Sequence, residues 1–385
     1  MAYPKETPKL PFLESDILTQ ITVTYEDIIA EPSKLQQLTD KYGIIIVTNL
    51  ADNCSQLAEG IKQSMLAMIN EPKLNHQQQE LIWDIRDGYK KWNRDMIVGI
   101  PSKGYSTTKG MPQSKGAWAV RKNPKVREIF GLIHQTDPKD LAVSNDVVYT
   151  NMVSRTSEPT SCWAHVTQND AIKVGSKLSV QGVFHLTDCL TSDTANTAVW
   201  IGSHHEEIYR PLQQAIVPNT KTDHEMYLWD LPEKLKDQYH QGWIKHARQV
   251  PVPAGAMLLF NSRCIHQCYN TTGGYRVAVP ISWEPKSIRD QHPDGRKMLI
   301  NKLRQVLQGQ PTTHWGSLGI TNESGHLNYR GKIPMLTLCP EPLRIDLLRF
   351  NHVQPTESYK RKGGLYRMSL KQLKNLIKPE YLEMM

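Results

Sequence analysis

The sequence contains no long hydrophobic run. No window approaches the roughly 18 apolar residues that a membrane-spanning helix needs. The stretch from Met1 to Glu6 also lacks the apolar core of a signal peptide. We therefore expect an intracellular protein, in the cytoplasm or nucleus, without a membrane span.

Closely spaced cysteine pairs are missing as well. The chain has 6 cysteines and no CxxC pair, so we expect reduced thiols and no disulfide framework. Cys264 and Cys268 are four positions apart, but no second Cys or His pair follows at zinc spacing. We interpret them as small, half-buried residues near a strand rather than as a metal-binding pair.

Internal repeats and low-complexity tracts are absent too. With 39% apolar and 22% charged residues, the composition is that of a globular protein, which excludes wholesale disorder. At roughly 100–200 residues per domain, a length of 385 allows two or three domains, or one large β domain with extensions.

Positive charge is concentrated at one end of the chain. The net charge is +8, and the segment Arg344 to Lys378 carries nine basic and two acidic residues, so the rest of the chain is close to neutral. Such a segment favours contact with a polyanion or an acidic protein partner. It has no motif that reads RNA or DNA. A solvated surface that only aids solubility explains the same charges.

Hydrophobic periodicity predicts an α+β protein whose centre is mostly β. Residues 43–49 form a β-branched apolar run typical of a buried strand, and a helix is expected after Asp52. Residues 1–20 suggest an irregular lead-in. In residues 178–186 two faces alternate, and one face carries the polar side chains of Gln181 and His185. Further strands are expected at 141–152, 198–201, 257–260 and 276–283.

Three motifs occur in a characteristic order. Trp163-Ala164-His165-Val166-Thr167-Gln168 comes first, Ala198 to His204 follows, and Pro253 to His266 is third, with Arg276 ten residues later. Over roughly residues 40–285 the chain resembles the phytanoyl-CoA dioxygenase family of Fe(II)/2-oxoglutarate oxygenases. It looks closest to the branch found in algae and large DNA viruses, and Val120 to Val126 and Thr312 to Trp315 are also similar to that branch.

The resemblance implies a double-stranded β-helix (jelly roll) core, while hydrophobic spacing predicts the flanking helices and a helical C-terminal extension. We therefore divide the chain into a lead-in (1–40), an oxygenase-like jelly-roll domain (41–285) and a helical, basic extension (286–385). In such enzymes two histidines and one carboxylate hold Fe(II), and an arginine binds the far carboxylate of 2-oxoglutarate. By position, His165 and His266 match the metal ligands and Arg276 matches the arginine. Gln181 and Tyr149 are expected to line the same cavity. The expected cofactors are Fe(II) and 2-oxoglutarate if the site is functional, and none otherwise.

One ligand of that set is replaced. The His-x-Asp motif of the family reads His165-Val166-Thr167 here, and threonine supplies no anionic oxygen at neutral pH. Asp170 is the nearest carboxylate, and it would need a local bulge to reach the metal. The glycines that the family usually has before the Gly202-Ser203-His204 element are also missing.

Three interpretations follow. The chain is a degenerate member that keeps the fold and serves a structural or interaction role, including one in a virus particle. Alternatively, it is an active hydroxylase with an atypical metal site that uses two histidines, Asp170 or water, with an unidentified substrate. The third interpretation is a halogenase-like variant with a halide beside Thr167. We favour the first. His185, His204 and His205 are interpreted as structural residues.

Overall fold

The structure is a computed structural model. It describes residues 9–69, 99–100, 105–106, 112, 114–151, 162–168, 179–191, 194–216, 226–269, 276–295, 298–299 and 302. Asp170, Thr312 to Trp315, Cys339 and the basic segment Arg344 to Lys378 lie outside the described residues. The predictions for these residues stay predictions, as does the division into three domains.

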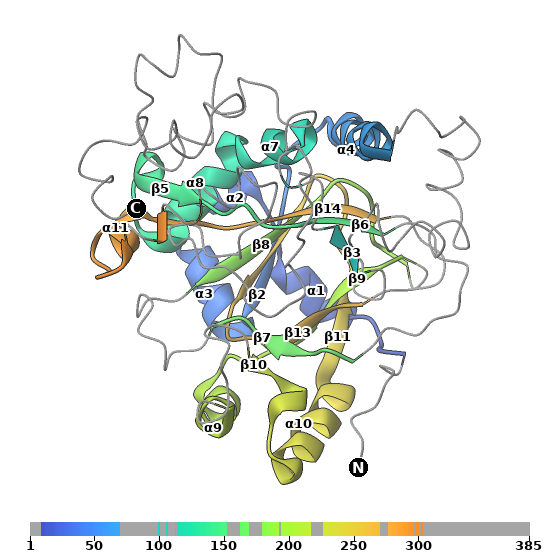
Figure 1. The fold of residues 1–385 in the computed structure, drawn as a ribbon, viewed down its shortest axis with the longest axis vertical. Coiled ribbons are helices and arrows are strands. Elements are labelled where there is room, and N and C mark those ends of the chain that lie inside the picture. Colours follow the sequence, from blue (N-terminus) through green and yellow to red (C-terminus); the bar gives the residue numbers. More distant parts are fainter. Residues whose placement is uncertain are drawn as a thin grey trace.

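The protein is a mixed α+β structure built on two large sheets (Figure 1). The larger sheet has eight strands, all antiparallel to their neighbours except the parallel pair at one edge. In spatial order they are β1 (Thr22–Thr24), β2 (Ile44–Thr48), β12 (Met257–Asn261), β8 (Val180–His185), β14 (Arg276–Ile281), β6 (Val148–Asn151), β4 (Tyr105–Ser106) and β3 (Gly99–Ile100).

The second sheet has five antiparallel strands and carries the first motif, the start of the second and His266 at the end of the third. In spatial order they are β10 (Met226–Tyr227), β7 (His165–Val166), β13 (His266–Tyr269), β9 (Asn196–Trp200) and β11 (Ala247–Val250). A small sheet pairs β15 (Trp283–Pro285) with β5 (Leu141–Val143). Pro280 lies in β14, and the register of β14 with the neighbouring strand β6 stops at Ala278. Proline lacks an N–H group, but at this position β6 has no partner for that group, so the ladder loses no hydrogen bond.

Helices cover the outer faces of both sheets. Figure 1 shows α7 and α8 at one side of the molecule and α9 and α10 at the opposite end, near β7 and β10. The helices are α1 (Ser15–Ile21), α2 (Tyr25–Ala30), α3 (Ser33–Tyr42), α4 (Cys54–Ile69), α7 (Lys115–Arg121), α8 (Pro124–His134), α9 (Glu206–Ile216), α10 (Glu233–His246) and α11 (Lys286–Asp290), with 3-10 turns at Pro138–Asp140 and Leu228–Asp230.

The first helix corrects the expected irregular lead-in over residues 1–20. The segment Ser15–Ile21 is helical, and Ile21 is fully buried against the strands. Two turns of helix are too short to show a hydrophobic period, so the segment takes its structure from this packing contact.

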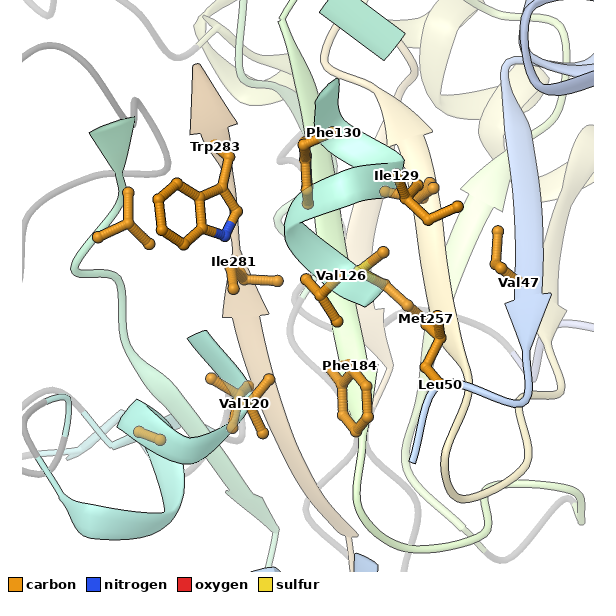
Figure 2. Close-up of a cluster of buried hydrophobic side chains, with 14 of the residues drawn as sticks. Val47, Leu50, Val120, Val126, Ile129, Phe130, Phe184, Met257, Ile281 and Trp283 are labelled. Carbon is orange, nitrogen blue, oxygen red and sulfur yellow. The ribbon is translucent and has the colours of Figure 1, made fainter. Parts of the chain in front are cut away.

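The outer face of the larger sheet packs against α7 and α8. Figure 2 shows Val126, Ile129 and Phe130 of α8 over Phe184 and Met257 of the sheet. The outer face of the five-stranded sheet packs in the same way against α9 and α10, through residues that include Leu212 and Trp243. Each outer face is therefore closed by apolar side chains, which leaves the inner faces to carry the polar residues.

The two inner faces share a third cluster, and strand alternation assigns the site residues to it. On β8, Phe184 belongs to the outer cluster and Val183 to the inner one, so Gln181 and His185 share the inner face with Val183. This is the division that the alternation in residues 178–186 predicts.

The same alternation holds on the other strands of the site. On β7, Ala164 and Val166 pack outwards, so His165 and Thr167 point inwards. On β14, the inward position of Ala278 places Arg276 on the inner face as well.

Candidate active site

The two predicted metal-binding histidines lie side by side. His165 of β7 and His266 of β13 are direct partners in the antiparallel register, and both side chains are buried. Their ring centroids are 4.4 Å apart, and the rings are tilted by 46°. Two imidazoles that bind one ion at about 2.1 Å and at a right angle have centroids about 4.5 Å apart. The spacing therefore suits a shared ion.

Backbone carbonyls orient both rings. The Nδ1 atom of His165 lies 3.3 Å from the carbonyl oxygen of Trp163, and that of His266 lies 2.8 Å from the carbonyl oxygen of Cys264. A carbonyl only accepts, so in each neutral ring Nδ1 carries the proton and Nε2 carries the lone pair. This is the tautomer of a histidine that binds a metal through Nε2.

Aromatic side chains hold His165 from both sides. Its ring stacks on Trp163 with centroids 5.0 Å apart and on Tyr227 with centroids 5.2 Å apart. Tyr227 is the direct cross-strand partner of His165 on β10. The stacking fixes the plane of the His165 ring, so Trp163 packs here as a wall of the site.

The third ligand position is filled by a neutral hydrogen-bond network. The Thr167 hydroxyl donates to the carbonyl oxygen of Ser262 at 3.3 Å and accepts from the side-chain amide of Gln181. The same amide donates to the Ser262 hydroxyl at 3.3 Å, which in turn donates to the Ser179 hydroxyl at 3.2 Å. Thr167 is thus held in place by groups that carry no charge.

The described residues therefore do not supply the complete facial set of two histidines and one carboxylate. Among the described residues, no third His, Cys, Asp or Glu joins His165 and His266 in a group that could hold a metal ion. A hydroxyl that already donates to Ser262 is a weak substitute for a carboxylate toward Fe(II), which stands low in the Irving–Williams order. The two histidines suit an iron ion, and the third position does not.

A second polar cluster surrounds Arg276. Its side chain is fully buried, and its terminal nitrogens donate to the Thr197 hydroxyl at 3.1 Å and to the Cys268 sulfur at 3.7 Å. One of them also lies 3.5 Å from Nε2 of His185. The guanidinium carbon sits 4.9 Å from the centre of the Tyr149 ring, which is a cation–π contact.

The titration of two of these partners is shifted toward the neutral form. Burial, with the positive charge of Arg276 second, holds the pKa of His185 well below its ordinary value. Burial also raises the pKa of the Tyr149 hydroxyl well above its ordinary value. In the described part of the chain no carboxylate forms an ion pair with Arg276, and its Nε atom is buried without a hydrogen-bond partner.

A buried cation without an anion costs on the order of several kcal/mol. The described environment of Arg276 therefore suits an anion. It lies on the same inner faces as the histidine pair, because His266 and Cys268 are two residues apart on β13, or about 7 Å along the strand. A small dicarboxylate is long enough to contact both clusters.

The remaining residues singled out from the sequence fall into two groups, those that lie at the site and those that have a structural role. The structure brings Gln181 to the Thr167 network and Tyr149 to Arg276. It shows His204 and His205 at the end of α3, where their Nε2 atoms lie 2.9 Å from the carbonyl oxygen of Asp40 and 3.2 Å from that of Lys41. Those two histidines satisfy the free carbonyls of a helix C-terminus, which is a structural role.

Two features of the site escaped the sequence reasoning. Ser262 follows β12 and reaches Thr167 only through the pairing of distant segments, so no local pattern points to it. His185 was interpreted as structural, although its alternation with Gln181 places both on one face. That alternation was the available signal for a role at the site. The described cysteines are all buried: Cys54, Cys162, Cys189, Cys264 and Cys268.

Comparison with known proteins finds likeness in structure alone. No family model matches the chain, and a search of curated proteins returns no match. Among solved structures, the GlcNAc-inducible protein GIG2 of Candida albicans is similar over 77% of this chain and 73% of its own, with 12% identity and a TM-score of 0.47.

Two further similar structures are non-heme enzymes of nogalamycin biosynthesis that depend on alpha-ketoglutarate (2-oxoglutarate). The epimerase SnoN, solved with Fe3+, alpha-ketoglutarate and nogalamycin RO, shares 13% identity over 66% of this chain and 85% of its own, with a TM-score of 0.40. The carbocyclase SnoK shares 12% identity over 68% and 86%, with a TM-score of 0.42. At these values the functional argument rests on the side chains of the site.

Proposed function

We propose that this chain is a degenerate member of the Fe(II)/2-oxoglutarate oxygenase superfamily that binds a small organic acid without oxidising it. The observation that carries the proposal is the Thr167 hydroxyl, held between the Gln181 amide and the Ser262 carbonyl where an oxygenase needs a carboxylate. The bound acid supplies the anion that the buried Arg276 lacks among the described residues. The chain then acts as a binding or interaction component.

The finer assignments belong to the same proposal. The pairing of a larger and a five-stranded antiparallel sheet around one polar interior supports a double-stranded β-helix. The order of the three motifs supports the phytanoyl-CoA dioxygenase family and its algal and viral branch. A place in a virus particle rests on that sequence resemblance alone.

The test compares metal and acid binding. The protein is titrated anaerobically with Fe(II), 2-oxoglutarate or both, and followed by visible absorption and thermal stability. We expect stabilisation by 2-oxoglutarate in the presence of a chelator, and no metal-to-ligand charge-transfer band. A charge-transfer band together with turnover of 2-oxoglutarate to succinate would overturn the proposal.

An active hydroxylase with an atypical metal site is the second candidate. It is favoured by one observation, the orientation of the His165 and His266 rings, which place their lone pairs on Nε2. Iron binding by the unaltered protein separates the two candidates. The halogenase-like variant would require halide-dependent iron binding in the same titration.

A further inference from the structure

His185 is an unusual neighbour for an arginine that binds an anion. Its side chain is fully buried on the inner face of β8, and its Nε2 atom accepts from Arg276 at 3.5 Å. Its Nδ1 atom has no hydrogen-bond partner. A buried imidazole that makes one long hydrogen bond, and makes it to a cation, stabilises the ligand-free protein poorly.

Among the described residues Arg276 is the one charge that acts on His185, and the other titratable groups around Arg276 are Tyr149, Cys268 and Cys189. Arg276 comes from β14, Tyr149 from β6 and Cys268 from β13, and Cys189 follows on the segment of His185 itself. Burial keeps the Tyr149 hydroxyl and the Cys189 thiol protonated by raising their pKa values. Among the described residues, Arg276 is therefore the one cation that lines the ligand-free pocket.

A dicarboxylate brings two negative charges to this pocket. In an oxygenase the metal ion balances the second charge, but the described residues supply no third metal ligand beside His165 and His266. Resting on the proposed function, we propose that His185 is the specificity-determining residue of the Arg276 site: a dicarboxylate binds together with one proton, taken from solvent onto Nε2 of His185. The carboxylate then accepts from both Arg276 and the protonated His185.

Electrostatics gives the direction of this coupling. The charge of Arg276 is the second cause, after burial, of the low pKa of His185. A carboxylate placed between the two side chains offsets the positive charge of Arg276 and therefore raises the pKa of His185. Between the free and bound pKa values, affinity for the dicarboxylate rises about tenfold for each unit by which the pH falls. A monocarboxylate is balanced by Arg276 alone and takes up no proton.

The experiment is isothermal titration calorimetry of the full chain with 2-oxoglutarate and, separately, with valerate. A chelator is present, and two buffers with different ionisation enthalpies are used between about pH 6 and about pH 8. The difference in enthalpy between the buffers reports the number of protons bound. We expect about one proton per 2-oxoglutarate in this range and close to none per valerate.

The variant His185→Gln keeps a polar side chain of similar size but cannot take a proton. We expect it to bind 2-oxoglutarate with no proton uptake and with little dependence on pH, and His185→Asn serves as the second variant. The control His246→Gln alters an exposed histidine on α10 and should keep the uptake. Two results would overturn the inference. One is proton uptake that persists in His185→Gln, which would assign the proton to His165 or His266. The other is binding of 2-oxoglutarate by the unaltered protein without proton uptake. A protein that binds neither acid overturns the proposed function itself.

Discussion

His165 and His266 face each other across neighbouring strands, with ring centroids 4.4 Å apart and both Nδ1 atoms beside backbone carbonyls. This is half of a metal site, set up to bind through Nε2. The other half is the hydroxyl of Thr167, which is engaged with neutral groups. The same site therefore predicts weak iron binding and a substitution that should strengthen it.

The first prediction concerns Thr167→Asp. The new carboxylate lies beside the Gln181 amide and completes the set of ligands, so Fe(II) binding should appear or strengthen at least tenfold. Without metal the variant should lose about 1–3 kcal/mol of unfolding free energy, because it buries an uncompensated charge. Thr167→Asn is the matched neutral control and should gain no iron affinity. Anaerobic titration and thermal melts with and without Fe(II) measure both effects, and equal iron binding by the two variants would contradict the prediction.

The second prediction concerns the charge of Arg276. Replacing it by Met removes a buried cation that has no ion-pair partner among the described residues, so the ligand-free protein should keep or increase its stability. The affinity of Arg276→Met for 2-oxoglutarate should fall by at least a hundredfold. Arg276→Lys keeps the charge but loses the planar guanidinium, so its affinity should lie between those of the unaltered protein and Arg276→Met. Urea unfolding and calorimetry measure the two properties. A large destabilisation in Arg276→Met would show that a protein carboxylate already compensates the arginine.

The third prediction is a loss of stability in acid that depends on His185. Its folded-state pKa is depressed, by burial first and by Arg276 second, so the unfolded state binds the proton first as the pH falls. The contribution of His185 to the unfolding free energy is therefore fully present above the ordinary histidine pKa of about 6.5. Below that pH the unfolding free energy falls by up to about 1.4 kcal/mol per pH unit. Urea unfolding at about pH 7.5 and about pH 5.5 should show a smaller difference for His185→Gln than for the unaltered chain. An unchanged difference would assign the acid sensitivity to other groups.

The fourth prediction tests the contact between α3 and the second motif. Gly43 ends α3 with a φ of 74°, and a Cβ there would lie 2.5 Å from the Cys264 sulfur and from Nδ1 of His204. Gly43→Ala should therefore cost at least about 1–3 kcal/mol of unfolding free energy, from strain and steric overlap together. Gly60→Ala is the control, because a Cβ at this position on α4 meets nothing within 4 Å and should stabilise the helix slightly. Similar melting temperatures for the two variants would argue against the overlap.

The sequence by itself determined which side chains face the interior and what one of them cannot do. Alternation placed Gln181 and His185 on one face of β8, and the identity of Thr167 already excluded an anionic ligand at that position. These are local properties, because the direction of a strand side chain follows from its parity and the charge of a residue from its chemistry.

Only the tertiary structure decided which of these residues meet. His266 pairs with His165 from 101 positions away, Gln181 reaches Thr167 through the packing of two sheets, and His185 lies beside Arg276 because β8 pairs with β14. Register between distant strands depends on the burial of whole faces at once, which no local pattern contains. For that reason the sequence could suggest the two metal ligands through resemblance, while the neutral network at Thr167 and the His185–Arg276 pair emerged only from the fold.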